Sequence, residues 1–192
     1  MTRLRKFKTF LVVTFIACIM MGYTTAEARG SDGKNIYFGA GFLRSLAKYK
    51  SGSADSNFDG WGATALAGMN LGALFFEGEY GRIDALNTLQ STTYLEKSSN
   101  TYFAARAGWN FGVFALGGGL QQNSLDVDNV TTLGTSGRTS YKGLSYQAFA
   151  RLIFEGRETY NTVLEVKYGT GTITGLELSE TQIGLKFVFS PF

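Results

Sequence analysis

Thr181-Gln-Ile-Gly-Leu-Lys-Phe-Val-Phe-Ser-Pro-Phe192, the last stretch of the chain, decides the fold, because its apolar residues recur at every second position. The apolar set consists of Ile183, Leu185, Phe187 and Phe189, and the alternate set of Gln182, Gly184 and Lys186. A period of two is that of a β-strand, since successive side chains point to opposite faces. The stretch therefore predicts a strand with one apolar and one polar face.

Residues 1–28 have the three parts of a signal peptide. The basic start is followed by an apolar core at residues 10–21 and by the small-x-small sequence Ala26-Glu27-Ala28; the basic residues are Arg3, Arg5, Lys6 and Lys8. A permanent helical anchor is disfavoured because the apolar core is short for a bilayer. Lipidation of Cys18 is also disfavoured, because this residue lies inside the core. We expect export, cleavage after residue 28 and a mature domain of residues 29–192.

The mature chain is expected to carry a net charge near zero. The signal peptide holds four of the 18 Lys and Arg residues and one of the 15 Asp and Glu residues, which leaves 14 of each sign. There is no basic surplus to favour nucleic acid as a partner. Cys18 is the only cysteine, so a disulfide-stapled scaffold is excluded for the mature chain.

Alternation of the same kind recurs along the chain and predicts eight strands. They are expected within residues 36–42, 61–69, 74–83, 102–109, 114–123, 144–154, 160–168 and 181–189. The connections alternate in length. Long polar loops are expected at residues 48–60, 84–100, 126–139 and 169–180, and tight turns at 70–72, 110–112 and 155–159. An even strand number with alternating loop lengths predicts an all-β fold, an eight-stranded antiparallel up-and-down transmembrane β-barrel.

A soluble lipocalin-like barrel would also have eight strands, and the composition of the two faces separates the alternatives. The apolar set has large side chains on every strand, whereas only 17% of the chain is charged, which is too little for a charged, solvated exterior. Amphipathic aromatic residues near the expected strand ends suit the two membrane interfaces. These residues are Trp61, Tyr80, Trp109, Tyr160 and Tyr168. We therefore expect the apolar face to meet lipid and the polar face to line the interior.

The interior face is expected to carry a network of opposite charges. Its members are Glu77, Glu79, Arg106, Arg151, Glu165, Lys167 and Lys186. Counted from the tight turns, Glu77 is level with Arg106 and Arg151 is level with Glu165, so each pair can meet across neighbouring strands. Two interpretations remain: a structural plug, and an ion path lined by the same residues. An eight-stranded barrel leaves room only for side chains, which favours the plug.

This pattern resembles the small eight-stranded outer-membrane proteins of Gram-negative bacteria, the OmpA/OmpX-type and opacity-type barrels. The resemblance covers residues 35–192 and includes an aromatic C-terminal strand like their assembly signal, here Ile183, Leu185, Phe187, Phe189 and Phe192. Pro191 and Ser190 depart from that signal, which has an aromatic residue two positions before the terminal Phe. The resemblance implies a cell outer membrane location, contact with lipid and lipopolysaccharide, and insertion by the outer-membrane assembly machinery. It transfers no residue-specific function.

We expect no enzyme activity and no cofactor or metal. The chain has no histidine, which excludes Ser-His-Asp and histidine–metal chemistry. Glu77 and Glu79 could form a glycosidase-like acid pair, but their place beside Arg106 favours a salt bridge. The leading expectation is a monomer that recognises a host or envelope ligand through its four long loops. A structural envelope role and a narrow porin-like channel are the alternatives.

Overall fold

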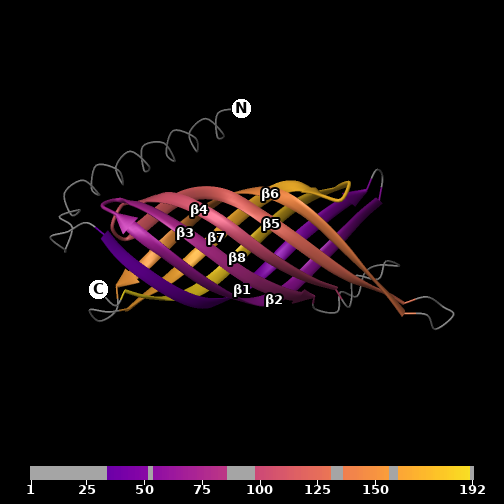
Figure 1. Cartoon of the computed structure of the whole chain (residues 1–192), viewed down its shortest axis with the longest axis horizontal. Coiled ribbons are helices and arrows are strands. Elements are labelled where there is room, and N and C mark those ends of the chain that lie inside the picture. Colours follow the sequence, from indigo (N-terminus) through magenta and orange to yellow (C-terminus); the bar gives the residue numbers. More distant parts are fainter. Residues whose placement is uncertain (1–33, 52–53, 86–97, 131–135, 156–159, 191–192) are drawn as a thin grey trace, which may run out of the picture.

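A computed structural model describes residues 34–51, 54–85, 98–130, 136–155 and 160–190, and these residues form eight β-strands (Figure 1). The strands are β1 (Lys34–Ser51), β2 (Ala54–Leu71), β3 (Leu74–Ala85), β4 (Ser98–Asn110), β5 (Phe114–Val130), β6 (Ser136–Glu155), β7 (Tyr160–Ile173) and β8 (Leu176–Phe189). The expected signal peptide and Phe192 lie outside the described residues. No helix of the described residues is long and apolar enough to cross a membrane.

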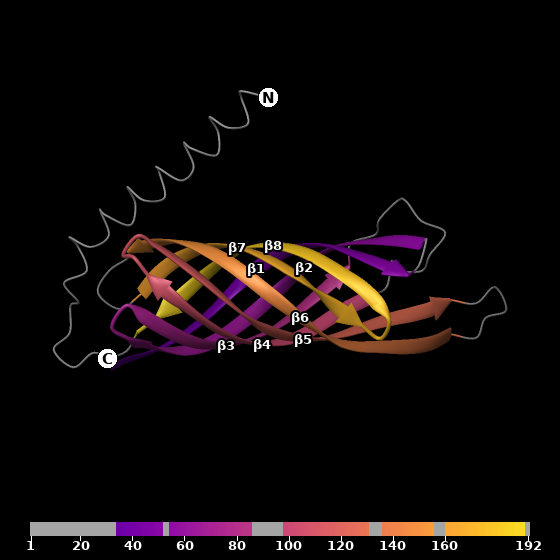
Figure 2. The ribbon, with the colours of Figure 1, turned by 90° about the horizontal axis from the view of Figure 1, so that it is seen from above.

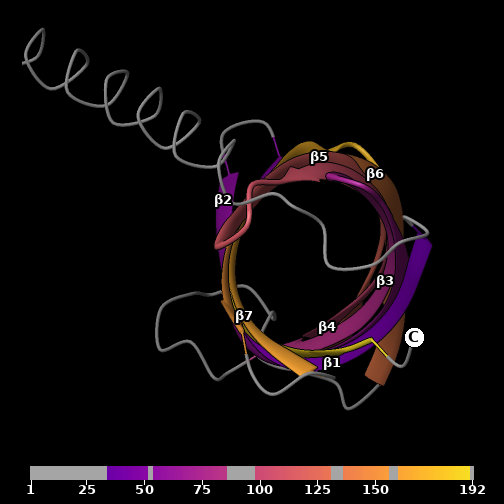
Figure 3. The same ribbon diagram turned by 90° about the vertical axis from the view of Figure 1, so that its left-hand side faces the viewer.

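The eight strands form one closed antiparallel barrel, as the alternation predicts (Figure 3). Each strand pairs with its neighbours in the chain, and β8 closes the ring by pairing with β1 from Phe38↔Phe189 to Lys50↔Glu177. Following the pairing once round the barrel from Lys48 leads back to β1 at Phe38, ten residues earlier. This stagger tilts the strands, and closure leaves no sheet edge along the shared part of the wall.

The outer wall is apolar. Large hydrophobic side chains are exposed on all eight strands, among them Phe42, Phe103, Leu152 and Phe187. Such a continuous apolar belt does not occur on soluble monomers and needs an apolar surrounding. The expected orientation of the two faces is therefore confirmed, with the apolar face outside.

Three of the four expected long loops are mostly strand, and this part of the sequence-based prediction is wrong. β1 continues to Ser51 and β2 begins at Ala54, and likewise β5 continues to Val130 and β6 begins at Ser136. β7 and β8 are joined by Thr174 and Gly175 alone. Both residues of this last turn have positive φ, as a two-residue hairpin turn of the primed type requires. In the fourth loop β3 extends to Ala85 and β4 begins at Ser98, and residues 86–97 lie outside the described residues. The β1–β2, β5–β6 and β7–β8 hairpins lie at the same end of the barrel, on the right in Figures 1 and 2, and we call it the hairpin end.

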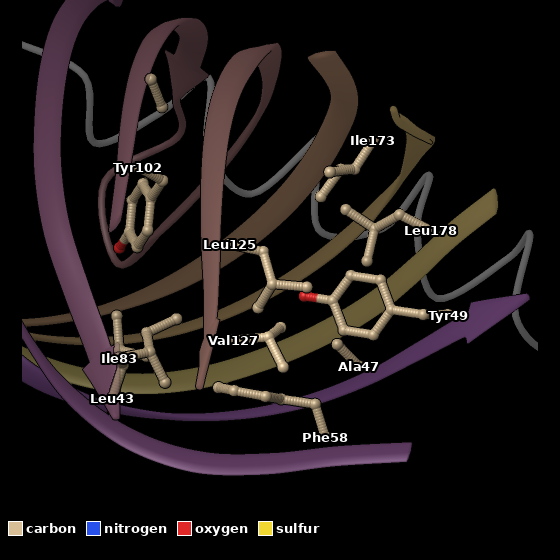
Figure 4. Close-up of a cluster of buried hydrophobic side chains, with 11 residues drawn as sticks. Leu43, Ala47, Tyr49, Phe58, Ile83, Tyr102, Leu125, Val127, Ile173 and Leu178 are labelled. Carbon is tan, nitrogen blue, oxygen red and sulfur yellow. The ribbon is translucent and has the colours of Figure 1, made fainter. Parts of the chain in front are cut away.

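An inward-facing apolar cluster explains why these polar stretches remain strands. It contains Leu43, Ala47, Tyr49, Phe58, Ile83, Tyr102, Ala104, Leu125, Val127, Ile173 and Leu178, and it fills the interior near the hairpin end (Figure 4). Inward apolar residues such as Tyr49, Leu125 and Leu178 alternate with outward polar ones, so these extensions bury apolar side chains. Burial raises the pKa of the Tyr49 phenol. Tertiary packing thus outweighs the polar composition that suggested loops.

The opposite end, which we call the turn end, has the tight connections. β2 and β3 are joined through Gly72, and β4 and β5 through Gly112, both with positive φ. The Gly112 N–H donates to Asn110 Oδ1 (2.9 Å), which fixes the second turn. Both turns fall where the sequence predicts them.

Four of the large inward aromatic side chains fit inside the narrow barrel because a glycine lies opposite each of them. Four cross-strand pairs show this: Tyr37↔Gly68, Phe75↔Gly108, Tyr102↔Gly81 and Phe149↔Gly117. A Cβ added at Gly81 would lie 2.4 Å from the Tyr102 ring, and one at Gly117 would lie 2.4 Å from the Phe149 ring. Pairing of aromatic residues with glycine is a known means of packing a curved sheet.

We predict that Leu164→Arg lowers the free energy of unfolding by about 2–4 kcal/mol, because Leu164 lies on the outer wall between Leu152 and Leu185 at the level of the belt. Thr172→Arg is the matched control. It is on the same strand and faces outward, but lies above the belt, so its cost should be about 0–1 kcal/mol. Urea titrations in lipid vesicles measure both. Equal losses would mean that the wall is not covered by lipid at Leu164.

Candidate functional site: the charged lumen

The middle of the barrel holds the seven charged residues that the inward alternation singles out. All seven side chains point into the lumen, and each residue is at most 8% exposed. They are Glu77, Glu79, Arg106, Arg151, Glu165, Lys167 and Lys186. The register places Glu77 opposite Arg106 and Arg151 opposite Glu165. The structure thus brings all seven together, on β3, β4, β6, β7 and β8.

Arg106 is the centre of this cluster. Its guanidinium donates to Glu77 and Glu79 through Nη2 and to Glu165 through Nη1, the last at 2.9 Å. The three carboxylates come from β3 and β7, which lie on opposite sides of β4 round the ring. One side chain therefore ties together strands that do not pair with each other. Charge-assisted bonds of this kind are stronger than neutral ones.

Arg151 completes the acid–base contacts toward the turn end. Its Nε donates to Glu165 (2.6 Å) and its Nη2 to Glu77 (2.7 Å). Its guanidinium carbon also lies 5.0 Å from the Phe75 ring centroid and 4.7 Å from that of Phe149. Arg151 also lines a cavity of about 70 Å³ at the turn end of the lumen, together with Tyr37 and Asn110.

The two lysines complete the cluster. Lys167 Nζ donates to Glu79 (2.7 Å) and to the Tyr102 hydroxyl (3.3 Å). Lys186 Nζ donates to Glu165 (2.7 Å) and also to Glu79. Tyr102 in turn donates to Glu79 (2.6 Å). Each carboxylate of the cluster accepts from several donors, which offsets the cost of enclosing its charge.

Glu180 is a buried acid that the sequence analysis placed in a loop. It accepts from Ser45 Oγ (2.6 Å), from the Gln182 amide (2.7 Å) and from the Gln121 amide (3.3 Å), all of them neutral donors. Together with Asn100, Asn123 and Ser145, these residues form a buried polar group in the interior. The alternation of Leu178, Glu180 and Gln182 is the signal that could have located Glu180.

Glu180 also makes the lumen neutral. Among the described residues, the buried cations are Arg106, Arg151, Lys167 and Lys186, and the buried carboxylates are Glu77, Glu79, Glu165 and Glu180. Four charges of each sign share the interior. Toward the hairpin end the charged cluster is followed by amide and apolar side chains, and Tyr102 of the apolar cluster bonds directly to Glu79. In the part of the chain that the structure describes, no group of three or more metal-ligating side chains could hold a metal ion.

The five aromatic residues predicted at the membrane interfaces all face outward. Trp109 and Tyr160 lie at strand ends, at the turn end of the barrel. Trp61, Tyr80 and Tyr168 do not lie at strand ends as expected, because β2, β3 and β7 continue beyond them. Their role as interface anchors stays a prediction.

The predicted assembly-signal strand is β8. Ile183, Leu185, Phe187 and Phe189 are exposed on the outer wall, and β8 is the strand that closes the barrel on β1. Phe192 lies outside the described residues. Recognition of this strand by the assembly machinery stays a prediction.

Comparison with solved structures places the fold among small outer-membrane barrels. Neisserial surface protein A matches with a TM-score of 0.59 and 17% identity over 82% of this chain and 99% of that chain. Ail, the attachment invasion locus protein of Yersinia pestis, matches in complex with the heparin analogue sucrose octasulfate, with a TM-score of 0.54 and 14% identity over 81% and 99%. No protein-family profile and no curated protein matches the sequence. The predicted resemblance to eight-stranded outer-membrane barrels is confirmed at the level of the fold.

Arg106→Ala should lower the free energy of unfolding by about 3–5 kcal/mol, because it leaves three enclosed carboxylates without their common partner. Adding Glu79→Gln should restore part of the loss, since the two residues are in contact. The control is Arg82→Ala, an exposed arginine paired with Asp84, with an expected cost of about 0–1 kcal/mol. Additive losses in the double variant, measured by urea titration, would contradict a coupled network.

Proposed function

We propose that this chain is an exported, integral protein of the outer membrane that acts by surface recognition at its hairpin end. The apolar belt supports a membrane location, and the fold is that of known outer-membrane barrels. The expected signal peptide would supply export. In the usual orientation of such barrels, the tight turns face the periplasm and the hairpin end faces outward.

A filled lumen argues against transport. The charged layer is held by ion pairs among seven side chains and is followed by an apolar cluster across the same interior. An ion crossing the barrel would have to break these ion pairs and then enter the apolar cluster. The interior also offers no catalytic base of the histidine type. Recognition by the hairpins is the function that remains best supported, ahead of a purely structural role.

The observation that carries this proposal is an open strand edge on β6. β6 pairs with β5 from Val130↔Ser136 onward, but its pairing with β7 begins only at Gly143↔Ile173. Among the described residues, the segment Ser136–Tyr141 therefore has a β-ladder on one side only. Figures 1 and 2 show the β5–β6 hairpin reaching beyond the β7–β8 hairpin.

The backbone groups that face this open side can be identified from Lys142. Its carbonyl accepts from Thr174 N (3.0 Å) and its N–H donates to Thr174 Oγ1 (2.9 Å), so Lys142 points toward β7. Strand residues alternate in the side to which their backbone groups point. Ser136, Arg138 and Ser140 therefore direct N–H and C=O groups to the open side. A row of this kind is a template for an added strand.

We infer that the partner is an extended polypeptide segment that adds to β6. Ail, a structural neighbour, has been solved with a sulfated heparin analogue, and a glycan ligand is the competing idea for this end of the barrel. The geometry of the edge favours a peptide, because its regular spacing of donors and acceptors matches another backbone. A structural envelope protein would have no use for a long, one-sided edge, which carries a risk of aggregation.

Ser140→Pro should abolish peptide binding without destabilising the barrel. Proline removes the N–H that faces the open side but no bond to β5, so the ladder that holds the hairpin is kept. Ser140→Ala is the matched control and should bind as the wild type does. Binding of the detergent-folded protein to immobilised extracellular-matrix proteins measures the effect. Equal binding by Ser140→Pro and wild type, or no binding to any protein tested, would contradict recognition through this edge.

A further inference from the structure

The cavity that Arg151 lines, which we call the turn-end cavity, lies inside the barrel. All eight strands contribute to its wall. Asn110 ends β4 and Asn161 is the second residue of β7, so the cavity lies at the turn end, from which Figure 3 views the barrel. Its volume of about 70 Å³ is far below the roughly 300–1,000 Å³ of small-molecule sites. It can therefore admit a small anion or the end of a chain, and nothing larger.

Arg151 is the one charged residue among the described residues that line this cavity. Its side chain is 8% exposed, more than any other side chain of the charged cluster. Its Nε and Nη2 donate to Glu165 and Glu77, and among the described residues no acceptor is bonded to its Nη1. Because a guanidinium has five N–H groups, Arg151 retains donors for an acceptor in the cavity.

The charge balance of the cluster favours an anion at this place. Its seven residues comprise four cations and three carboxylates. The fourth buried carboxylate, Glu180, accepts its hydrogen bonds from the neutral groups of Ser45, Gln121 and Gln182. The charged cluster thus has one positive charge in excess, and Arg151 is its member that reaches the cavity. An anion beside Arg151 would be held by charge-assisted hydrogen bonds.

Polar and apolar side chains alternate round the wall of the turn-end cavity. Three register pairs of lining residues show this: Asn70↔Phe75, Asn110↔Ala115 and Asn161↔Val188. Asn110 Oδ1 accepts from the Gly112 N–H (2.9 Å), so the NH2 group is the remaining polar end of that side chain and is a donor. A ligand that uses the whole wall has an anionic group and a small apolar group side by side.

We propose that the turn-end cavity binds the C-terminal carboxylate of a peptide chain whose last residue has a small apolar side chain. Arg151 and the amide of Asn110 donate to the carboxylate, and the last side chain lies against Val163 and Val188. The planar guanidinium matches the geometry of a carboxylate, and capture of chain ends in this way is a recurring mode of peptide recognition. A free inorganic anion would leave the apolar part of the wall unused.

The site lies at the opposite end of the barrel from the β6 edge, so the two kinds of binding are independent. In the orientation that the proposed function gives the barrel, the turn end faces the periplasm, and the chain end then belongs to a periplasmic peptide or protein. This last assignment rests on the proposed function. Binding of the carboxylate itself does not, because it is measured on the folded barrel in detergent.

The test is an NMR titration of the folded barrel in neutral detergent micelles. The probe is the peptide acetyl-Gly-Gly-Ala with a free C-terminal carboxylate, compared with the same peptide amidated at its C-terminus. The free acid should shift the backbone amide signals of Asn110 and Gly112, at the cavity, and leave that of Lys50, at the hairpin end, unchanged. The amidated peptide should bind roughly tenfold more weakly, the scale of losing one charge-assisted contact.

Asn161→Asp tests the site without breaking any ion pair of the charged cluster. It adds a negative charge at the cavity with little change in shape, and it should weaken binding of the free acid roughly fivefold, the scale of one unit charge about 4 Å away in water. Asn57→Asp is the matched control, the same change on the exposed outer wall of β2, and should bind within about twofold of wild type.

Two further variants give the sign of the charge effect. Glu155, the register partner of Asn161, is exposed and lies outside the cavity lining. Glu155→Gln removes a negative charge near the cavity and should bind the free acid at least as tightly as wild type does. Arg151→Gln removes the guanidinium and should abolish binding. Because this last variant also breaks ion pairs, heat-modifiable migration verifies that its barrel is folded.

Three results would overturn the proposal. They are equal affinity for the free acid and the amidated peptide, the same affinity in Asn161→Asp and Asn57→Asp, and the absence of any shift at Asn110 and Gly112. Sodium acetate separates the two sources of a carboxylate. If acetate binds as tightly as the peptide, the cavity is a site for a small free anion and the assignment to a chain end is wrong.

Discussion

Four cations and four carboxylates share the interior of the barrel, and the rest of the structure depends on their mutual neutralisation. None of these groups has bulk water to solvate its charge, so each must be held by its neighbours. Arg106 has the most demanding position, because it contacts carboxylates from two strands that do not pair with each other. The barrel is thereby held by side-chain contacts across the lumen as well as by pairing between neighbouring strands. A barrel held in this way is a rigid support for its hairpins.

The layers above and below follow from the narrowness of the barrel. Phe75 and Phe149 lie opposite glycines and contact the Arg151 guanidinium. Toward the hairpin end, amides surround Glu180 and give way to an apolar cluster that contains Tyr49 and Leu125. This cluster keeps the strands paired beyond the membrane. Because the β7–β8 hairpin ends early, β6 is left with a β-ladder on one side only from Ser136 to Tyr141.

The alternation of the sequence is enough to predict eight strands, their order, the closed barrel and the direction of each face, because a period of two is a local property of the chain. It also selects the seven charged residues of the central cluster. It does not reveal that Lys48–Gly60 and Gly169–Glu180 are mostly strand, since their inward residues, such as Phe58 and Ile173, pack against residues that are distant in the sequence. Glu180, which balances the fourth cation, is missed for the same reason. Which carboxylate each cation contacts is set by side-chain geometry across the ring and is not contained in the spacing.

Single-channel recording in planar bilayers tests the central claim, that the charged layer and the apolar cluster close the lumen, most directly. The filled interior predicts that the wild-type barrel passes no steady current. A regular open conductance in the wild type, with its ion selectivity reversed by Arg106→Glu and its stability hardly changed, would contradict it. The charged residues would then line a pore.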